Sequence, residues 1–203
     1  MGKKKSVFIA ATRQNDGKTM TSIGLFHNFK KRFSPITYMK PVGQQYLKVD
    51  SKKIDKDAVL FQKIYDLKSD LSDISPIAVE RGFTENYILN GNKEELQNRV
   101  KDAYNRLEAE NNFVLIEGTG HAGVGSVFDL SNADVAKLVG SKVILVSIGG
   151  IGKSIDELIL NKACFDKVGV ELCGVIINKV LEDKYEKINK ITRLALEKHE
   201  FVF

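Results

Sequence analysis

The chain alternates short apolar runs with longer segments of helical periodicity, and no other feature constrains its fold as strongly. This order of segments produces parallel strands joined by crossover helices. We therefore expect an α/β fold of three layers (α/β/α), with a central, mostly parallel sheet whose two faces are covered by helices. The predicted strands are residues 6–11, 36–42, 113–117, 142–147 and 172–178.

The helix predictions rest on apolar spacing and on capping residues. Two helices are predicted from apolar faces, one formed by Leu96, Val100, Tyr104 and Leu107 and another by Tyr185, Ile188, Ile191 and Leu194. Ser154 with Glu157 forms a capping-box pattern that opens a helix which Gly169 closes. Residues 131–140 are expected to form a shorter helix.

The stretch from residue 44 to residue 91 has a less regular pattern. It contains a predicted helix over residues 55–67, followed by loop-like sequence. Because it follows the second strand, at the sheet edge where strand ends present a nucleotide, we expect it to shape a pocket for a second ligand.

Length and charge favour one globular domain spanning residues 1–203. The net charge of +5 comes from 31 basic against 26 acidic residues, and Lys3, Lys4 and Lys5 account for much of it. Because the other lysine and glutamate residues are spread through amphipathic segments, we expect no nucleic-acid partner. No apolar run approaches the roughly 18–20 residues needed to cross a bilayer, and Cys164 and Cys173 lack metal-ligand spacing. We expect a cytoplasmic protein that does not associate with membranes and whose cysteines are reduced core residues.

The strongest chemical signal is the segment Ala-Thr-Arg-Gln-Asn-Asp-Gly-Lys-Thr at residues 11–19, which leaves the first strand and enters a helix. Strand, loop and helix in this order are the context of a phosphate-binding P-loop. Gly17 lets the backbone close around an anion, the Lys18 ammonium neutralises phosphate charge, and Thr19 offers a hydroxyl to magnesium. The predicted nucleotide contacts are Thr12, Arg13, Gln14, Asn15, Asp16, Gly17, Lys18 and Thr19.

The loop thus predicts a P-loop NTPase that binds ATP and Mg²⁺, although Thr12 stands where the strict pattern has glycine. The alternative without function is a Gly-Lys-Thr helix start that binds nothing. The strand before the loop and the helix after it favour the binding loop.

Three further motifs accompany the loop. Residues 38–43 read Tyr-Met-Lys-Pro-Val-Gly, residues 55–60 read Asp-Lys-Asp-Ala-Val-Leu, and residues 115–120 read Leu-Ile-Glu-Gly-Thr-Gly. Over most of the chain these motifs resemble dethiobiotin synthetase and its relatives, including the dethiobiotin-synthetase-like N-terminal domains of some phosphotransacetylases. In that family five residues separate the first small residue of the loop from the glycine that precedes the lysine. The same spacing separates Ala11 from Gly17 here, so Ala11 takes the place of the glycine that the strict pattern requires.

The resemblance implies roles for the charged residues of these motifs. By this likeness Lys18 and Lys40 are the catalytic groups, and Lys40 steadies the transferred phosphoryl group and a substrate carboxylate or carbamate. Thr19, Asp57 and Glu117 would hold Mg²⁺, which prefers hard oxygen ligands of this kind. Without the resemblance, Asp57 is equally well an exposed residue on a helix turn.

The resemblance also assigns residues to the nucleobase and to a second substrate. Asn178, at the end of the fifth strand, matches an asparagine that faces adenine, although it is equally well a turn former. The small-molecule substrate is expected beside Lys40, Gln44, Gly120 and His121. Here the chain departs from the synthetases, because Gln44 stands near their substrate-binding serine, Gln14 replaces a threonine and His121 interrupts the run after Glu117. His121 is equally well a polar residue without a ligand.

Three functions are compatible with these residues. The first is an ATP-dependent ligase or ATPase that phosphorylates and activates a carboxylate or carbamate of a small molecule. The second is a nucleotide-sensing regulatory domain without chemistry on a small molecule. The third is a partition-type ATPase, in which Arg13 would replace a lysine that reaches across an ATP-dependent dimer. The Glu-Gly-Thr-Gly motif fits the synthetase relatives better than the partition ATPases.

The resemblance further implies a homodimer with the substrate site at the subunit interface. Relatives usually continue beyond the length of this chain, adding a strand and a base-binding loop, and residues 201–203 read as the start of a strand. We therefore expect either the N-terminal part of a longer protein or a naturally shortened copy.

Overall fold

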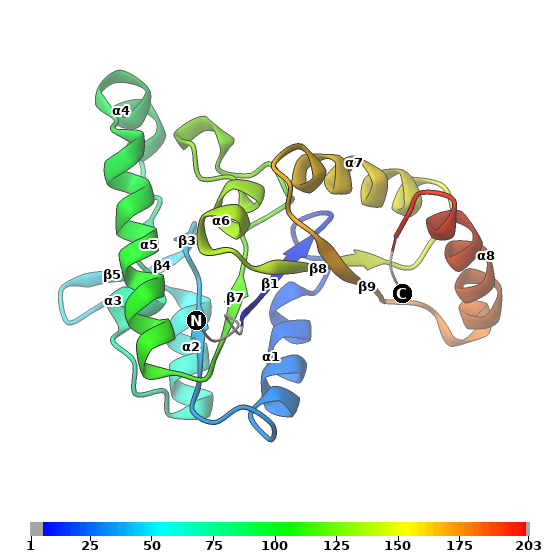
Figure 1. Ribbon diagram of the computed structural model, residues 1–203, viewed down its shortest axis with the longest axis horizontal. Coiled ribbons are helices and arrows are strands. Elements are labelled where there is room, and N and C mark those ends of the chain that lie inside the picture. Colours follow the sequence, from blue (N-terminus) through cyan, green and yellow to red (C-terminus); the bar gives the residue numbers. More distant parts are fainter. Residues whose placement is uncertain (1–5, 202–203) are drawn as a thin grey trace.

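The computed structural model describes residues 6–201 of the chain, so residues 202–203 of the predicted terminal strand lie outside the described part. The centre is a five-stranded parallel sheet (Figure 1). In their order across the sheet the strands are β2 (Ile36–Met39), β7 (Phe113–Glu117), β1 (Ser6–Ala11), β8 (Lys142–Ile148) and β9 (Leu172–Asn178). Because the chain leaves β1 toward β2 and later leaves β7 toward β8, the loops after β1 and β7 open onto one crevice.

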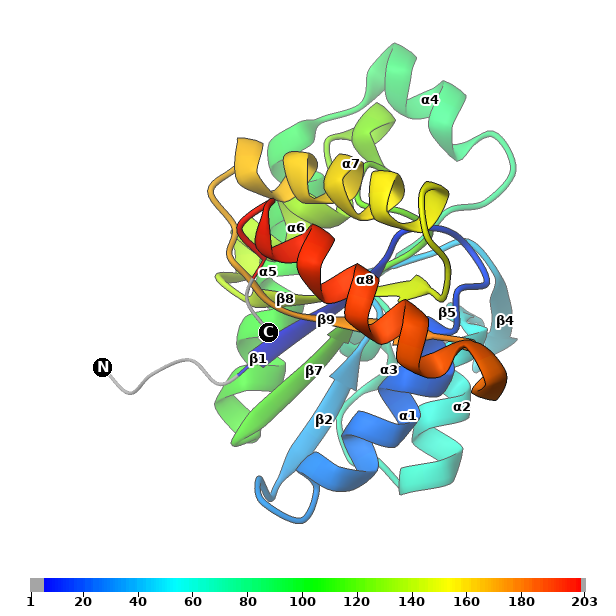
Figure 2. The same cartoon turned by 90° about the vertical axis from the view of Figure 1, so that its right-hand side faces the viewer.

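Helices cover both faces of the sheet (Figure 2). On one face lie α1 (Lys18–Phe29) and α2 (Lys56–Tyr65). On the other lie α5 (Lys93–Glu110), α6 (Asn132–Val139) and α7 (Lys153–Lys167), while α8 (Tyr185–Glu197) runs along β9 at the edge. The predicted α/β/α architecture with a central parallel sheet is confirmed.

The core is built from strands that are apolar nearly throughout. Every residue of β7 is buried, and β1 is buried from Val7 onward, as expected where helices cover both faces. Each fully buried Ile, Leu or Val side chain stabilises the fold by roughly 1.5–3 kcal/mol. The Tyr38 ring of β2 stacks on Phe61 of α2, with ring centroids 3.8 Å apart, and Phe26 of α1 meets Phe61 edge to face. This aromatic cluster fixes α1 and α2 against β2.

Most strand predictions are confirmed, with one correction. β1, β7 and β9 have the predicted bounds, and β8 is one residue longer. The predicted strand 36–42 was wrong at its end, because the Lys40 amide leaves the sheet to donate to the Ile74 carbonyl and Pro41 has no amide hydrogen. The chain then forms β3 (Val42–Gly43), which pairs with β6 (Ile77–Ala78) in a separate two-stranded sheet.

Residues 44–91 hold more structure than the predicted helix and loop. An antiparallel hairpin is formed by β4 (Tyr46–Val49) and β5 (Lys52–Asp55), and Asp55 then caps α2. The short α3 (Leu71–Ile74) and the protruding α4 (Phe83–Asn90) follow. The hairpin strands are short and carry charged side chains, so their periodicity does not distinguish them from loop.

The ends of α6 agree with the sequence-based prediction, whereas the start of α7 differs from it. α6 begins after Ser131, which forms a capping box with Asp134, and it ends at Gly140 in a left-handed conformation. By contrast, Ser154 does not cap α7, because this helix already begins at Lys153 after Gly152.

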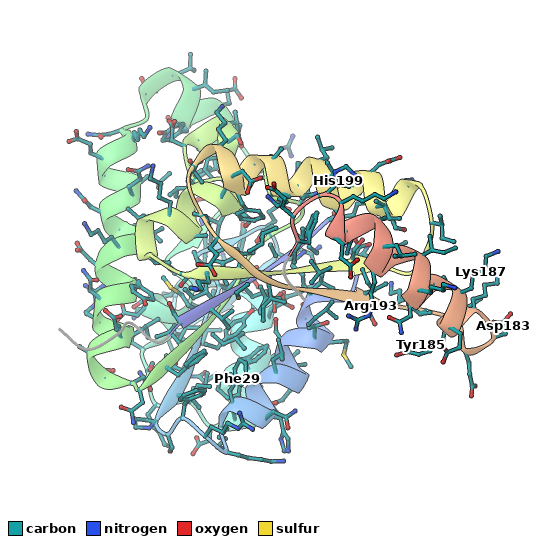
Figure 3. All side chains as sticks on the ribbon, turned by 45° about the vertical axis from the view of Figure 1, so that its right-hand side comes forward. Phe29, Asp183, Tyr185, Lys187, Arg193 and His199 are labelled. Atoms are coloured by element: carbon teal, nitrogen blue, oxygen red, sulfur yellow. The ribbon has the colours of Figure 1, made fainter. Side chains whose placement is uncertain are left out.

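The edge of the sheet at β9 and α8 also differs from the prediction. The buried residues of α8 are Ile188, Thr192 and Leu196, whereas Leu194 is exposed. Tyr185 is also exposed and lies at the start of the helix (Figure 3). The predicted stripe is confirmed at Ile188 and was wrong at Tyr185 and Leu194, because the buried face of the helix continues through the polar Thr192. Cys173 is exposed rather than in the core, since β9 is an edge strand. Among residues 6–201 no helix is both long and apolar enough to cross a membrane.

Candidate functional site

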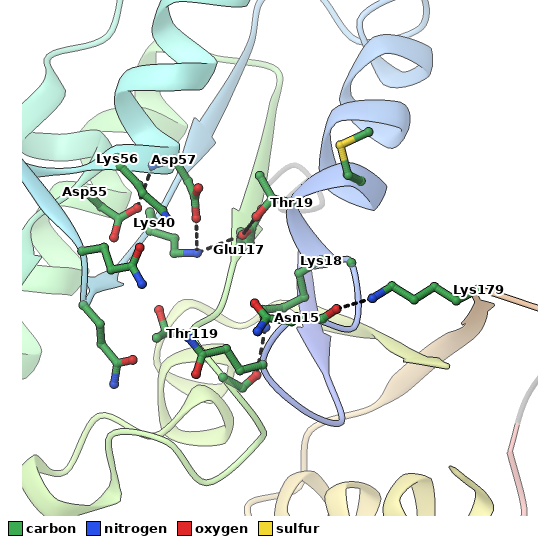
Figure 4. Close-up of a pocket in the computed structure, with 16 residues that line it drawn as sticks. Asn15, Lys18, Thr19, Lys40, Asp55, Lys56, Asp57, Glu117, Thr119 and Lys179 are labelled. Carbon is green, nitrogen blue, oxygen red and sulfur yellow. Dashed lines mark hydrogen bonds and ion pairs between the residues drawn. The ribbon is translucent and has the colours of Figure 1, made fainter. Parts of the chain in front are cut away.

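The carboxyl ends of β1, β2 and β7 open onto a pocket of about 390 Å³ (Figure 4). Parallel strands end at the same edge of a sheet, so the predicted residues that follow them converge here. The predicted residues that line the pocket are Gln14, Asn15, Gly17, Lys18, Thr19, Lys40, Gln44, Asp57, Glu117 and Gly120. The predicted residues that do not line it are Thr12, Arg13, Asp16, His121 and Asn178.

The phosphate loop, residues 12–17, leaves β1 and enters α1 at Gly17. Gly17 has φ +103°, a conformation that favours glycine, and a Cβ atom there would collide with the Asn178 amide. Among the described residues no side chain caps the N-terminus of α1. The amides of the first helical turn are therefore free to donate to an anion.

Three predicted nucleotide residues turn their side chains away from the pocket. The Thr12 hydroxyl donates to Asp16 Oδ2 at 2.7 Å and lies 3.1 Å from Ser147 Oγ. Arg13 Nε lies 2.9 Å from Glu157 Oε2 on α7, so Arg13 pairs within its own chain. These side chains support the loop from behind rather than facing a phosphate.

The end of β9 holds the other side of the loop. Asn178 Nδ2 donates to the Asp16 carbonyl at 2.9 Å, and Lys179 Nζ donates to the Asn15 carbonyl at 2.7 Å. The predicted adenine-facing amide thus contacts the loop backbone. Lys179 lines the pocket and was not predicted, although its place directly after Asn178 at a strand end was a usable signal.

Lys18 projects from the start of α1 toward the loop that follows β7. Its Nζ donates to the Gly120 carbonyl at 3.0 Å. Burial, and then the positive charge of Lys40, lower the pKa of Lys18 to about 8, with Glu117 and Asp16 offsetting part of the effect. A bound phosphate stabilises the charged form of a buried lysine like this one more than it stabilises a lysine that is already paired with a carboxylate.

Lys40 is the cation between two carboxylates. Its Nζ lies 2.9 Å from Glu117 Oε1 and 3.0 Å from Asp57 Oδ2 (Figure 4). Burial lowers the pKa of Lys40, but the charges of Glu117, Asp57 and Asp55 outweigh it and leave the pKa above its ordinary value. Lys40 is therefore a fixed positive charge in the lining of the pocket.

Glu117 has the chemistry of a magnesium ligand. It is fully buried, and its Oε1 accepts from the Thr19 hydroxyl at 3.0 Å as well as from Lys40. Its Oε2 is buried without a hydrogen-bond partner among the described residues. A carboxylate beside a hydroxyl fits Mg²⁺, which usually takes one or two carboxylates and completes its shell with phosphate oxygens and water. Within residues 6–201 no three acidic, histidine or cysteine side chains form a metal cluster.

Two further residues near Lys40 were missed by sequence reasoning. Asp55 lines the pocket, is 2% exposed and accepts from the Asp57 amide as the cap of α2. Burial raises the pKa of Asp55, and Lys40 offsets part of the rise. Burial, and then the charges of Glu117 and Asp57, raise the pKa of Tyr38 well above its ordinary value. The Asp-x-Asp spacing was visible in the sequence, but only the hairpin before α2 turns Asp55 inward.

The side of the pocket opposite the phosphate loop is polar. It is formed by Gln44, Gln45, Lys56 and Thr119, of which only Gln44 was predicted. His121 lies outside the lining and is exposed, with its Nδ1 accepting from the Gly123 amide at 3.2 Å. Amide and ammonium groups of this kind suit a small ligand that carries a carboxylate.

Sequence comparison identifies relatives along most of the chain. A family model described as AAA domain (AAA_26) matches residues 5–199. The ATP-dependent dethiobiotin synthetase BioD of Clostridium kluyveri is 27% identical, over 95% of this chain and 83% of that protein. BioD of Methanocaldococcus jannaschii is 25% identical, over 94% of this chain and 91% of that protein. The phosphate acetyltransferase of a Synechocystis strain is 22% identical over 86% of this chain, which spans only 25% of that longer protein.

Solved structures share the fold at low sequence identity. The BceF tyrosine kinase domain has a TM-score of 0.56 and 16% identity, covering 87% of this chain and 69% of its own. The signal recognition particle receptor FtsY of Elizabethkingia anophelis, solved in complex with GDP, has a TM-score of 0.54 and 13% identity, covering 88% of this chain and 50% of its own. These likenesses support the P-loop NTPase fold and nothing finer.

Proposed function

The chain belongs to the AAA domain family, as a dethiobiotin-synthetase-like P-loop ATPase, and on this premise we propose that it uses Mg-ATP to phosphorylate a carboxylate or carbamate of a small molecule. The observation that carries the proposal is the position of Lys40 Nζ between Glu117 and Asp57, in the same pocket as Lys18 and Thr19. A phosphate loop alone binds nucleotide. A buried lysine opposite the loop adds a positive charge that can orient the molecule that accepts the phosphoryl group.

The residues divide into a phosphate side and an acceptor side. The first-turn amides of α1 and the Lys18 ammonium would bind the phosphates. Lys40 would neutralise charge on the transferred phosphoryl group and orient the acceptor, with Gln44 and Lys56 beyond it. In the reaction an acceptor oxygen attacks the γ-phosphorus while the bond to the β–γ bridging oxygen breaks and ADP leaves.

Thr19, Glu117 and Asp57 would hold the magnesium ion. The hydroxyl of Thr19 beside the Glu117 carboxylate supports the first two ligands, and Asp57 is included because the likeness to the synthetases implies it. When bound, Mg²⁺ would neutralise part of the phosphate charge. The likeness to the synthetases also supports a homodimer, which sedimentation would test, and a cytoplasmic location.

The test is product formation with a panel of amino-carboxylic acids. We expect the chain to release ADP from Mg-ATP only when a suitable acid is present, and hydroxylamine to trap the acyl phosphate as a hydroxamate. Lys40→Met should abolish ADP release. The control Lys101→Met, at an exposed position on α5, should retain it. ADP release that is unchanged by Lys40→Met would contradict the proposal.

The nucleotide-sensing alternative predicts a different outcome of the same experiment. Tight Mg-ATP binding by calorimetry, with no ADP released for any acid, would support a regulatory domain. No binding of any nucleotide would exclude both functions.

A further inference from the structure

Two buried asparagines lie behind the pocket and take no part in the proposed transfer. Asn132 begins α6, Asn161 lies within α7, and each is only 4% exposed. A buried side-chain amide is costly unless its oxygen and nitrogen are both hydrogen-bonded. The partners of each amide therefore show which part of the backbone it holds.

Asn132 holds the loop that follows β7. Its Oδ1 accepts from the Thr119 amide at 3.0 Å, and its Nδ2 donates to the carbonyls of Thr119 at 2.8 Å and His121 at 2.7 Å. These bonds reach the residues on both sides of Gly120. The peptide planes that flank Gly120 are thereby fixed from behind.

Asn161 joins the same loop to the phosphate loop. Its Oδ1 accepts from the Ala122 amide at 2.8 Å, and its Nδ2 donates to the Thr12 carbonyl at 3.3 Å and the Glu157 carbonyl at 2.8 Å. One side chain on α7 therefore sets the spacing between the loop after β7 and the start of the phosphate loop.

The loop held by these amides is the one that contacts Lys18. Gly120 has φ +63° and accepts from Lys18 Nζ at 3.0 Å. The neighbouring Thr119 hydroxyl donates to the Val42 carbonyl, just before Gln44 on the acceptor side. Residues 118–122 thus contact both sides of the pocket.

We propose that Asn132 and Asn161 are positioning residues of the triphosphate site, which fix residues 118–122 so that the Gly120 carbonyl holds the Lys18 ammonium beside the phosphate loop. The inference rests on the proposed nucleotide binding. A lysine that is placed before the ligand arrives loses less conformational freedom on binding, which raises affinity.

The test compares affinity with stability in matched variants. Calorimetry would measure binding of the Mg²⁺ complex of adenylyl imidodiphosphate to the wild-type chain and to Asn132→Ala, Asn161→Asp and Val139→Ala. We expect Asn132→Ala to weaken binding about tenfold or more, as is typical when a supporting residue is lost. Asn161→Asp should also weaken binding, because it keeps the acceptor for Ala122 but loses the donation to Thr12.

Val139→Ala is the matched control. Val139 is buried on α6, the helix that begins at Asn132, and is not among the pocket residues. It should lower the melting temperature and leave the affinity unchanged. Hydrogen exchange adds a readout that a general loss of stability does not reproduce, since the Thr119 amide should exchange faster in Asn132→Ala than in Val139→Ala. If Asn132→Ala fails to fold, Asn161→Asp carries the same comparison.

The outcomes separate the two claims. A wild-type chain that binds no nucleotide would overturn the proposed function together with this inference. A wild-type chain that binds, with equal affinity in Asn132→Ala, Asn161→Asp and Val139→Ala, would overturn only the positioning role.

Discussion

Lys40 and Glu117 stand 77 positions apart in the chain, yet Lys40 Nζ donates to Glu117 Oε1 across 2.9 Å inside the protein. Their side chains are 6% and 0% exposed. Removing one partner of a buried pair leaves an uncompensated charge, which costs about 3–5 kcal/mol. We therefore expect Lys40→Met to lower the free energy of unfolding by about 3 kcal/mol or more at pH 7, as measured by urea denaturation.

Two controls accompany this prediction. The double variant Lys40→Met/Glu117→Gln should recover most of the loss, because no buried charge at Glu117 remains to be paired. Lys142→Met, which breaks an exposed ion pair with Glu171, should have no measurable effect. Wild-type stability in the single Lys40→Met variant would show that the buried pair does not form in solution.

Gly17 and Gly24 offer a matched pair within seven residues. Gly17→Ala should lower stability by about 1–2 kcal/mol and weaken nucleotide binding, because a side chain at φ +103° is strained and meets Asn178. Gly24 lies inside α1, where an added Cβ atom would meet no other atom within 4 Å. Gly24→Ala should therefore stabilise the fold by about 0.5–1 kcal/mol. Thermal unfolding of both variants measures this, and equal effects of the two substitutions would contradict it.

Two roles of Asn178, holding the backbone of the phosphate loop and contacting adenine, predict different effects of Asn178→Ala on ligand binding. If its amide acts by holding the Asp16 carbonyl, as its contact indicates, Asn178→Ala should weaken ATP and inorganic triphosphate binding by similar factors. If it instead reads adenine, only ATP binding should suffer. Competition binding with both ligands decides between the loop contact and the base contact that the family resemblance implies.

Lys18 predicts a pH dependence of nucleotide binding. Since its pKa is about 8 in the free chain, Lys18 is largely protonated below this pH and loses its charge above it. A bound triphosphate favours the ammonium, so binding takes up a proton above pH 8, and affinity should fall by up to about tenfold per pH unit there. Calorimetry in buffers of different ionisation enthalpy would measure the proton uptake.

Lys18→Arg is the control for this pH dependence, because arginine stays charged throughout the range. Its affinity, although lower, should change little between pH 8 and pH 9.5. An affinity of the wild-type chain that stays constant over the same range would contradict the prediction.

The parts of the site that could be predicted from sequence are those attached to regular elements. Lys40 directly follows β2, Glu117 ends β7 and Lys18 begins α1, so the order of strands and helices alone brings them to one edge. The fold was predictable for the same reason, since apolar strands and capped helices are local patterns. The functional roles of these residues stay predictions.

The remainder depends on contacts between distant segments. Thr12 and Asp16 were expected to face the nucleotide, but within a loop no periodicity tells which side chains turn inward. The roles of Asn132 and Asn161 as loop contacts follow from the packing of α6 and α7 against the loop after β7, which lies far from Asn161 in sequence. A polar residue in a predicted helix gives no sign of its partner until the tertiary contacts are known.

Because the strands of the central sheet are parallel, their carboxyl ends lie together and carry the pocket, whereas their amino ends lie together at the opposite edge and do not. The connections at the opposite edge include residues 30–35, between α1 and β2, which are mostly exposed and contribute nothing to the pocket lining. Exposed loop tips accept insertions better than buried segments do, and here the insertion should leave Phe33 in place, because its ring stacks on Phe113 of β7. An affinity tag inserted there would leave the phosphate loop untouched, so the chain can be immobilised for binding measurements without covering the pocket.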